Sequence, residues 1–129
     1  MGFGLAFCVA SGQIRQLSPA DFKKEIDKNK GILLDIRTPK ETAEGFIPNA
    51  LQSDFLAGDF QKEIQQIDKN QPVYVYCRSG RRSQKALQIF REKGFKNVGE
   101  LQGGFLQWEK LGFPVERKSK IKKLTQHKK

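Results

Sequence analysis

Two short runs of apolar residues place the strongest constraint on the fold of this chain. Residues 73–76 read Val-Tyr-Val-Tyr, and residues 32–36 are apolar except for Asp35. Apolar runs without polar alternation are typical of strands that are covered on both faces, as in parallel sheets. Helix-forming segments separate the two runs. We therefore expect an α/β fold with a mainly parallel central sheet and helices on both of its faces.

Other segments carry helix or strand signals of their own. Ser18 and Pro19 mark a helix start, because serine caps free N–H groups and proline suits the first turn. Further helices are expected within residues 38–45, 59–68, 83–93 and 105–111, and a further strand at 97–101. The chain has 129 residues and no interior linker, so residues 13–115 are expected to form one domain.

The two ends of the chain differ from this central part in composition. Residues 1–12 form an apolar leader, which is either a simple extension or the end of a longer export signal whose basic beginning is missing. Residues 116–129 carry seven cations and one anion, out of a net charge of +10 for the whole chain. Such a tail is expected to be disordered and to aid solubility, with a docking arm for RNA or anionic lipid as the alternative. The tail lacks aromatic residues that stack on bases, so no nucleic-acid partner is expected.

The segment after residues 73–76 carries the clearest sign of chemistry. It reads Cys77-Arg78-Ser79-Gly80-Arg81-Arg82 and leads into a helix near Ser83. In parallel α/β sheets the ligand site lies at the carboxyl ends of the strands, where Cys77 is placed. A short loop with a central glycine can turn its backbone N–H groups into one cup that binds an anion. Three arginines add positive charge, so Cys77 is expected to react as a thiolate.

The other residues that support cysteine or metal chemistry lie far from this loop in the sequence. The single histidine, His127, is in the basic tail, and the second cysteine, Cys8, is in the apolar leader. This scarcity disfavours a zinc site and a Cys–His catalytic pair, so no metal and no cofactor are expected. The loop itself must then activate Cys77. A role for Cys8 as a resolving thiol is an alternative that the sequence disfavours, because no C-x-x-C spacing ties it to Cys77.

Three ordered segments resemble the rhodanese family. They are residues 33–39 with 44–50, residues 75–83, and residues 101–105 with Trp108 and 112–115. The similarity extends from about residue 14 to residue 115 and implies the rhodanese-like three-layer fold. One position departs from the family pattern, because Phe46 stands where members often have histidine. We expect that difference to affect the rim of the pocket and not the nucleophile.

The resemblance also implies an activity and a set of site residues. A sulfurtransferase of this family moves a sulfane sulfur from a small anionic donor such as thiosulfate to cyanide or a thiol acceptor, for example thioredoxin or glutathione. The sulfur would travel as a persulfide on Cys77. Substrate binding is expected from Arg78, Ser79, Gly80, Arg81 and Arg82. Support of the loop is expected from Asp35, Arg37 and Ser83. The first two are expected to form an ion pair or a hydrogen-bond anchor beneath the loop, with direct substrate contact as the alternative, while Trp108 is expected to pack the last helix.

Two other functions stay open at this point. A cysteine phosphatase or arsenate reductase also uses a cysteine loop that ends in arginine, but phosphatases place that arginine six positions after the cysteine. Here Arg82 comes five positions after Cys77 and Ser83 takes the sixth, which favours a smaller cup suited to one sulfur atom. The second alternative is a non-catalytic binding module, although the intact Cys77 argues against it. A cytoplasmic monomer without a membrane span is expected, with a periplasmic or exported protein as the alternative if residues 1–12 belong to a signal peptide.

Overall fold

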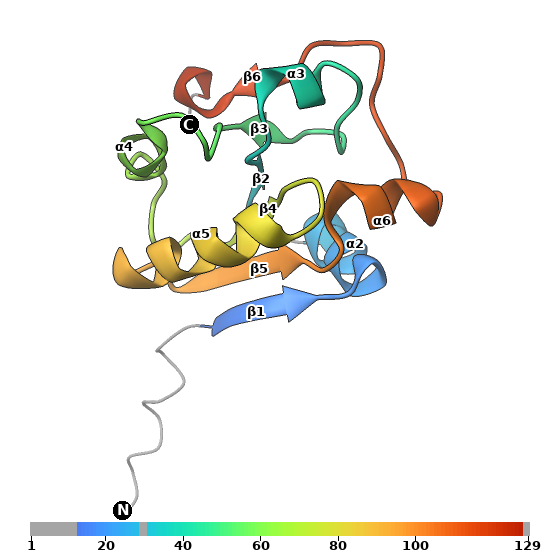
Figure 1. Cartoon of the computed structure of the whole chain (residues 1–129). Helices are drawn as coiled ribbons and strands as arrows, with labels where there is room; N and C mark the ends of the chain where they lie inside the picture. The colour runs from blue at the N-terminus through green and yellow to red at the C-terminus, as the bar shows by residue number, and fades with distance from the viewer. Residues whose placement is uncertain (1–12, 29–30, 128–129) are drawn as a thin grey trace, which may run out of the picture.

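A six-stranded parallel sheet forms the centre of the structure (Figure 1). The computed structural model describes residues 13–28 and 31–127. The strands are β1 (Gln13–Leu17), β2 (Ile32–Asp35), β3 (Leu51–Gln52), β4 (Val73–Tyr76), β5 (Asn97–Leu101) and β6 (Lys122–Lys123). They lie in the order β1-β5-β4-β2-β3-β6, and each of the five pairings is parallel. The predicted α/β fold with a parallel sheet is confirmed.

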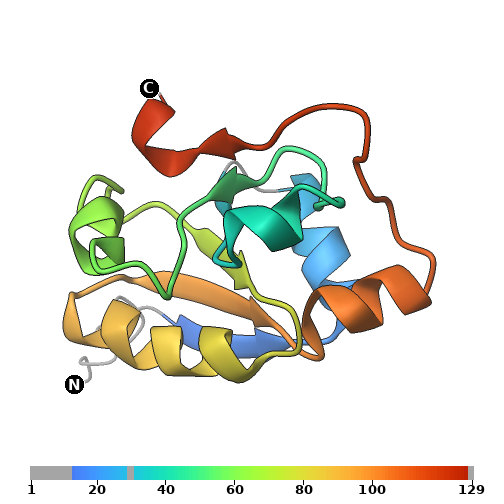
Figure 2. The ribbon, with the colours of Figure 1, turned by 45° about the horizontal axis from the view of Figure 1, so that its top comes forward.

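Helices cover both faces of this sheet, as the sequence predicted (Figure 2). They are α2 (Pro19–Lys28), α3 (Pro39–Thr42), α4 (Phe60–Ile64), α5 (Arg81–Glu92), α6 (Gly104–Lys110) and the 3-10 helix η1 (Leu124–Gln126). One apolar core contains Val73 and Val75 of β4 together with residues of α4 and α5. The other contains Tyr74 and Tyr76 with residues of α2 and α6. Successive side chains of β4 thus pack into the two cores on opposite faces of the sheet, which is why this strand is apolar throughout.

Aromatic side chains organise the core beneath α2 and α6. The Phe22 ring meets both Tyr74 and Trp108 edge to face, with ring centroids 5.9 and 6.0 Å apart. Trp108 is fully buried, and its indole N–H donates a hydrogen bond to the carbonyl of Pro114 at 2.8 Å. The expectation that Trp108 packs the last helix is therefore confirmed.

The strand β1 was not predicted, because its sequence Gln-Ile-Arg-Gln-Leu has only two apolar residues. It lies at an edge of the sheet and pairs with β5 alone, from Gln13 opposite Asn97 to Leu17 opposite Leu101. An edge strand is held by main-chain hydrogen bonds on one side and needs little apolar surface. The helix expected at 59–68 is also shorter, since α4 ends at Ile64 and turns continue the chain.

The expectation of a disordered basic tail is wrong for residues 116–127. The strand β6 pairs with β3 at the opposite edge of the sheet, and Leu124 is only 2% exposed, within the core that contains α4 and α5. The peptide groups of Phe46 and Glu116 also exchange two hydrogen bonds, at 3.1 and 2.7 Å. Charge composition misled the prediction, because pairing with β3 uses the main chain and one apolar residue anchors the end. Residues 1–12, and with them Cys8, lie outside the described residues.

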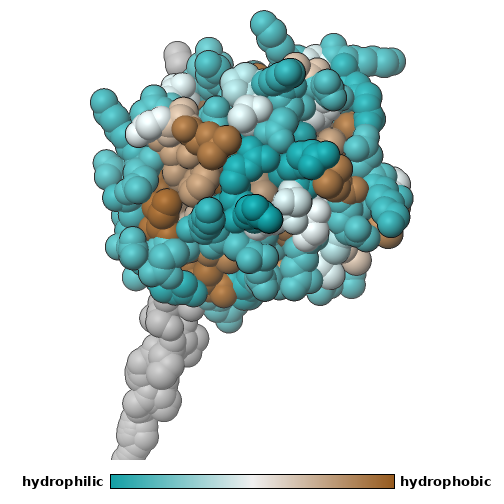
Figure 3. All heavy atoms as spheres, viewed as in Figure 1, coloured by the Kyte–Doolittle hydropathy of each residue, from teal (hydrophilic) through white to brown (hydrophobic). Residues whose placement is uncertain are grey.

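The surface is consistent with a protein that keeps its apolar residues inside. The face drawn in Figure 3 is mainly hydrophilic, with hydrophobic residues in separate small areas. Three large apolar side chains are exposed among the described residues, those of Leu56, Leu106 and Leu111. Within residues 13–28 and 31–127, no helix has both the length and the apolar character that a membrane crossing requires.

The anchoring of the tail by Leu124 can be tested with one substitution. We expect Leu124→Ala to lower the free energy of unfolding by about 2–4 kcal/mol, as for other buried leucines. The matched control is Leu111→Ala, since the Leu111 side chain is 54% exposed and its loss should change stability little. Urea unfolding of the two variants measures the difference. Equal effects of both substitutions would show that the tail is not packed on the domain.

Candidate active site

Cys77 lies at the carboxyl end of β4, between the ends of β5 and β2. Its side chain is fully buried, and α5 begins four residues later at Arg81. Two backbone N–H groups donate hydrogen bonds to the sulfur, from Gly80 at 3.1 Å and from Ser83 at 3.4 Å. The Ser83 hydroxyl lies 3.6 Å from the same sulfur. The N–H cup is therefore centred on Sγ at the N-terminus of α5, a position that favours a negative charge.

Glycine is required at two positions around this cup. Gly80 has φ +105°, a conformation that other residues rarely adopt, and this turn directs its N–H toward Sγ. Gly104 has φ +62°, and a Cβ atom there would lie 2.4 Å from the carbonyl oxygen of Arg78. The close approach allows Phe105 N–H to donate to the carbonyl of Cys77 at 2.9 Å and Leu106 N–H to that of Arg78 at 3.0 Å. The start of α6 thus fixes the loop from outside.

Asp35 and Arg37 form a buried ion pair, as the sequence predicted. Arg37 donates to both carboxylate oxygens of Asp35, at 2.7 Å from Nη2 and 3.0 Å from Nε, and is only 3% exposed. It also donates to the carbonyl of Gly45 at 2.7 Å, and its guanidinium lies 4.2 Å from the ring centroid of Phe105. The pair therefore links the end of β2 to Phe105, whose N–H donates a hydrogen bond to the Cys77 carbonyl.

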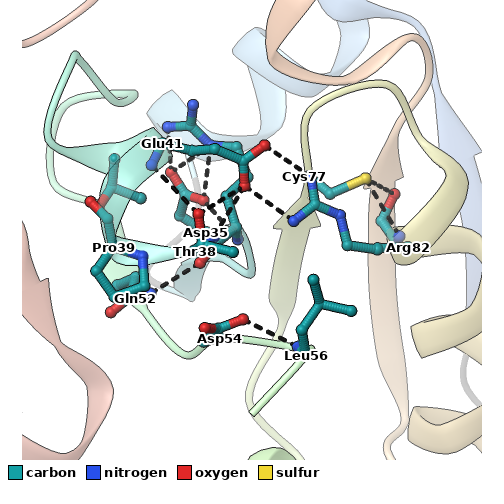
Figure 4. Close-up of polar contacts among 12 residues, drawn as sticks. Asp35, Thr38, Pro39, Glu41, Gln52, Asp54, Leu56, Cys77 and Arg82 are labelled. Carbon is teal, nitrogen blue, oxygen red and sulfur yellow. Dashed lines mark hydrogen bonds and ion pairs between the residues drawn. The ribbon is translucent and has the colours of Figure 1, made fainter.

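The three loop arginines do not behave alike. Arg78 and Arg81 are exposed, as is Ser79, whereas Arg82 is half-buried. Arg82 makes a two-pronged ion pair with Glu41, with both N–O distances 2.9 Å. Figure 4 shows Glu41 between Arg82 and the Thr38 that caps α3. The Arg82 charge is thus largely neutralised by Glu41 and is not a free cation beside the sulfur.

The ion pair changes the titration of both partners. Hydrogen bonds from Arg82, with further help from Thr38, lower the pKa of Glu41 from 4.5 to about 2. The pKa of Arg82 is raised, mainly by Glu41 and to a smaller extent by its nearness to Cys77. Glu41 therefore stays ionised at all physiological pH values and holds Arg82 in place.

Glu100 is a site residue that the sequence analysis missed. It lies on β5, is fully buried, and accepts a hydrogen bond from the Ser83 hydroxyl at 2.6 Å. Burial raises the pKa of Glu100, although hydrogen bonding by Ser83 and Gln16 opposes part of the shift. The available signal was an acidic residue among the apolar and small residues that follow Asn97 in this strand.

Several other features lie apart from the sulfur. The Phe46 side chain, expected at the pocket rim, is 4% exposed and belongs to the core with Trp108. A cavity on the α2 side of the sheet is lined by Tyr74 and Trp108 among others, and Cys77 is not part of its wall. Within the described ranges, no group of three or more histidine, cysteine or acidic side chains is arranged to hold a metal ion.

Comparison with known proteins identifies the family. The family model of the Rhodanese-like domain matches residues 18–111, so the chain belongs to the rhodanese family. A sulfurtransferase from Allochromatium vinosum is 38% identical over 89 residues, which are 69% of this chain and 81% of that protein. The putative sulfurtransferase YtwF of Bacillus subtilis is 35% identical, over 75% of this chain and 92% of that protein. A solved rhodanese-like domain protein from Staphylococcus aureus aligns with a TM-score of 0.69 and 28% identity, covering 82% of this chain and 100% of that one.

The names of further relatives are not uniform. The thiosulfate sulfurtransferase GlpE of Coxiella burnetii is 34% identical, over 74% of this chain and 87% of that protein. A tRNA uridine(34) hydroxylase of Cytophaga hutchinsonii is 33% identical, over 73% of this chain but only 31% of that longer protein. Relatives of similar length to this chain are thus named sulfurtransferases, and the family as a whole includes other roles.

The close approach at Gly104 predicts a large cost for any side chain there. Gly104→Ala should strain the backbone by about 1–2 kcal/mol and also displace the Arg78 carbonyl. Gly112→Ala is the matched control, because Gly112 has φ +81° but a Cβ atom there would meet no other atom within 4 Å. Thermal or urea unfolding should show the greater loss in Gly104→Ala. Equal losses would mean that the contact with the loop carbonyls contributes nothing.

The Glu41–Arg82 pair predicts a defined pH dependence of stability. Because folding lowers the pKa of Glu41 from 4.5 to about 2, its contribution is complete above pH 4.5 and is lost as the pH falls toward 2. Glu41→Gln should therefore lower the free energy of unfolding at pH 7 by about 1 kcal/mol, and this deficit should shrink in acid. Glu44→Gln, at an exposed neighbouring residue, is the control. A deficit that stays constant from pH 7 to pH 3 would contradict the role of the ion pair.

Proposed function

We propose that this chain is a sulfurtransferase that carries a sulfane sulfur as a persulfide on Cys77. The donor is a small anion such as thiosulfate, and the acceptor is cyanide or a thiol such as glutathione or thioredoxin. The observation that carries the proposal is the pair of N–H groups from Gly80 and Ser83 that point at the Cys77 sulfur. Donors fixed before reaction stabilise negative charge without reorganisation, whether that charge is on a thiolate or on a persulfide.

The first half of the reaction forms the persulfide. The Cys77 thiolate attacks the outer sulfur of thiosulfate and forms a new S–S bond. The S–S bond of thiosulfate breaks, and sulfite leaves with its electron pair. The negative charge then lies on the outer sulfur of the persulfide, close to the same N–H groups. The complete burial of Cys77 favours a donor that presents one sulfur atom to the cup over a bulky donor.

The second half returns the cysteine to its starting state. A nucleophilic acceptor attacks the outer sulfur, and the S–S bond to Cys77 breaks. Cys77 leaves as a thiolate, which the N–H groups again stabilise. Cyanide gives thiocyanate in this step, and a thiolate acceptor gives its own persulfide. No external oxidant or reductant enters the cycle.

The exposed arginines suit the recruitment of an anion. Arg78 and Arg81 are exposed at the mouth of the loop, where their charges attract a donor from solution and are screened by salt. Arg82 is held by Glu41, so we assign it mainly to shaping the loop. Substrate preference should therefore depend more on Arg78 and Arg81 than on Arg82.

The names of the shorter relatives support this proposal over its alternatives. Three of them are called sulfurtransferases, and one of these is called a thiosulfate sulfurtransferase. A phosphatase or arsenate reductase would require the loop to receive a tetrahedral oxyanion, yet Ser83, at the position of the phosphatase arginine, donates to Sγ and to Glu100. A non-catalytic binding module would have no use for a sulfur that receives two N–H donors.

Mass measurement of the intact protein tests the proposal directly. After incubation with thiosulfate and removal of the excess, the chain should gain the mass of one sulfur atom. The gain should disappear on addition of cyanide, with release of an equal amount of thiocyanate. Cys77→Ser should gain nothing, whereas the matched control Cys8→Ser should behave like the wild type.

Two results would contradict the proposal. A wild-type chain that gains no sulfur but hydrolyses an aryl phosphate would be a phosphatase. Sulfur that is gained equally by Cys77→Ser and lost in Cys8→Ser would move the reactive thiol to the leader.

A further inference from the structure

Ser83 lies between the Cys77 sulfur and the Glu100 carboxylate. Its hydroxyl oxygen is 2.6 Å from Glu100 Oε2, 3.6 Å from Cys77 Sγ and 3.3 Å from the carbonyl oxygen of Gly80. All three side chains are buried. The three side chains form a hydrogen-bond relay, Cys77–Ser83–Glu100, that runs from the reactive sulfur into the sheet and away from solvent.

The Ser83 hydroxyl has a single proton to donate, so its direction depends on Glu100. When Glu100 is ionised, the short contact of 2.6 Å is a charge-assisted bond from Ser83 to the carboxylate. When Glu100 is neutral, its own proton is donated to Ser83, and the Ser83 hydroxyl is free to donate to the sulfur. Only the second arrangement gives a Cys77 thiolate a third hydrogen bond, besides those from Gly80 and Ser83 N–H.

The surroundings of Glu100 favour the neutral carboxyl. Its other oxygen, Oε1, is buried and has no hydrogen-bond partner among the described residues. The side chains that hydrogen-bond to the carboxyl are those of Ser83 from α5 and Gln16 from β1, and both are uncharged. Arg82 also interacts electrostatically with Cys77, but its charge is already balanced by Glu41 in their ion pair. A thiolate and a carboxylate close together in a buried site repel each other, so Cys77 and Glu100 do not readily carry negative charge at the same time.

We propose that Glu100 is a positioning residue that stores the proton of Cys77 by way of the Ser83 hydroxyl. In this step the Cys77 S–H bond breaks and its proton passes to the Ser83 oxygen, while the proton of Ser83 passes to Glu100 Oε2. The negative charge moves from the carboxylate to the sulfur, and the total number of protons is unchanged. Glu100 thereby acts as an internal base for Cys77, in a site that uses no histidine.

This inference deepens the proposed function, because the thiolate it produces is the nucleophile of sulfur transfer. It also explains why the acidic residue is buried behind the loop, where it cannot contact a donor. The same three side chains would stabilise a persulfide anion on Cys77. While Glu100 keeps the proton, the Ser83 hydroxyl remains free to donate a hydrogen bond to the sulfur.

Infrared spectroscopy of the complete protein, without any sulfur donor, tests the stored proton. The wild type at pH 7 should show the carbonyl band of a neutral, buried carboxylic acid, and this band should be absent in Glu100→Gln. In Cys77→Ala no thiolate opposes ionisation of Glu100, so the band should titrate away at lower pH than in the wild type. A purely structural carboxyl would show no dependence on Cys77.

A second measurement follows the ionisation of the Cys77 thiol. The ultraviolet absorbance of the Cys77 thiolate, with Cys77→Ser as the blank, should titrate at higher pH in Ser83→Ala than in the wild type, by about one pH unit, because a hydrogen bond to the charged form is lost. Glu100→Gln should keep a thiolate midpoint no higher than that of the wild type, since glutamine resembles the neutral carboxyl. Circular dichroism checks that each variant folds, and isotope labelling of glutamate assigns the band if Glu100→Gln does not.

The proposal is overturned if the wild type lacks the neutral carboxyl band at pH 7, or if Cys77→Ala leaves its titration unchanged. It is also overturned if Ser83→Ala leaves the thiolate midpoint in place. Failure of sulfur transfer is a separate outcome, because the infrared and ultraviolet titrations need no donor and the mass measurement needs no titration.

Discussion

The position of the Cys77 sulfur depends on peptide hydrogen bonds on both sides of one short loop. On the inner side, the N–H groups of Gly80 and Ser83 point at the sulfur. On the outer side, the N–H groups at the start of α6 bind the carbonyls of residues 77 and 78. The loop is thus fixed by main-chain groups that no single side-chain substitution removes, except where a glycine is required.

The buried polar residues around the loop act as a support for this main-chain frame. The Asp35–Arg37 pair joins the end of β2 to Gly45 and to the Phe105 ring. The Arg82–Glu41 pair joins the first turn of α5 to α3. Both arginines are paired within the protein, so the positive charge that remains for a substrate comes from the exposed Arg78 and Arg81. The site therefore combines a buried cup of N–H groups around the sulfur with an exposed, positively charged rim.

Local patterns were sufficient to predict the parallel sheet and the place of Cys77. The apolar runs at β2 and β4, and the glycine in the loop, each follow from short-range preferences of the chain. The edge strands β1 and β6 could not be found in this way, because each is held by main-chain pairing with a strand distant in sequence. The acidic character of Glu100 within its strand is visible in the sequence, but its link to Cys77 through Ser83 is not. Its contact with Ser83 depends on the packing of α5 against β5, which the sequence of either element alone does not reveal.

On the proposed mechanism, Cys77 takes up the outer sulfur of its donor and transfers that same atom to the acceptor. Thiosulfate with radioactive sulfur at the outer position follows the atom in a single turnover. We expect label to bind to the protein in an amount equal to Cys77 and to leave as labelled thiocyanate when cyanide is added. Thiosulfate labelled at the inner position should release all of its label as sulfite. Retention of the inner label, or no retention of either, would show that the loop binds the anion without transferring its sulfur.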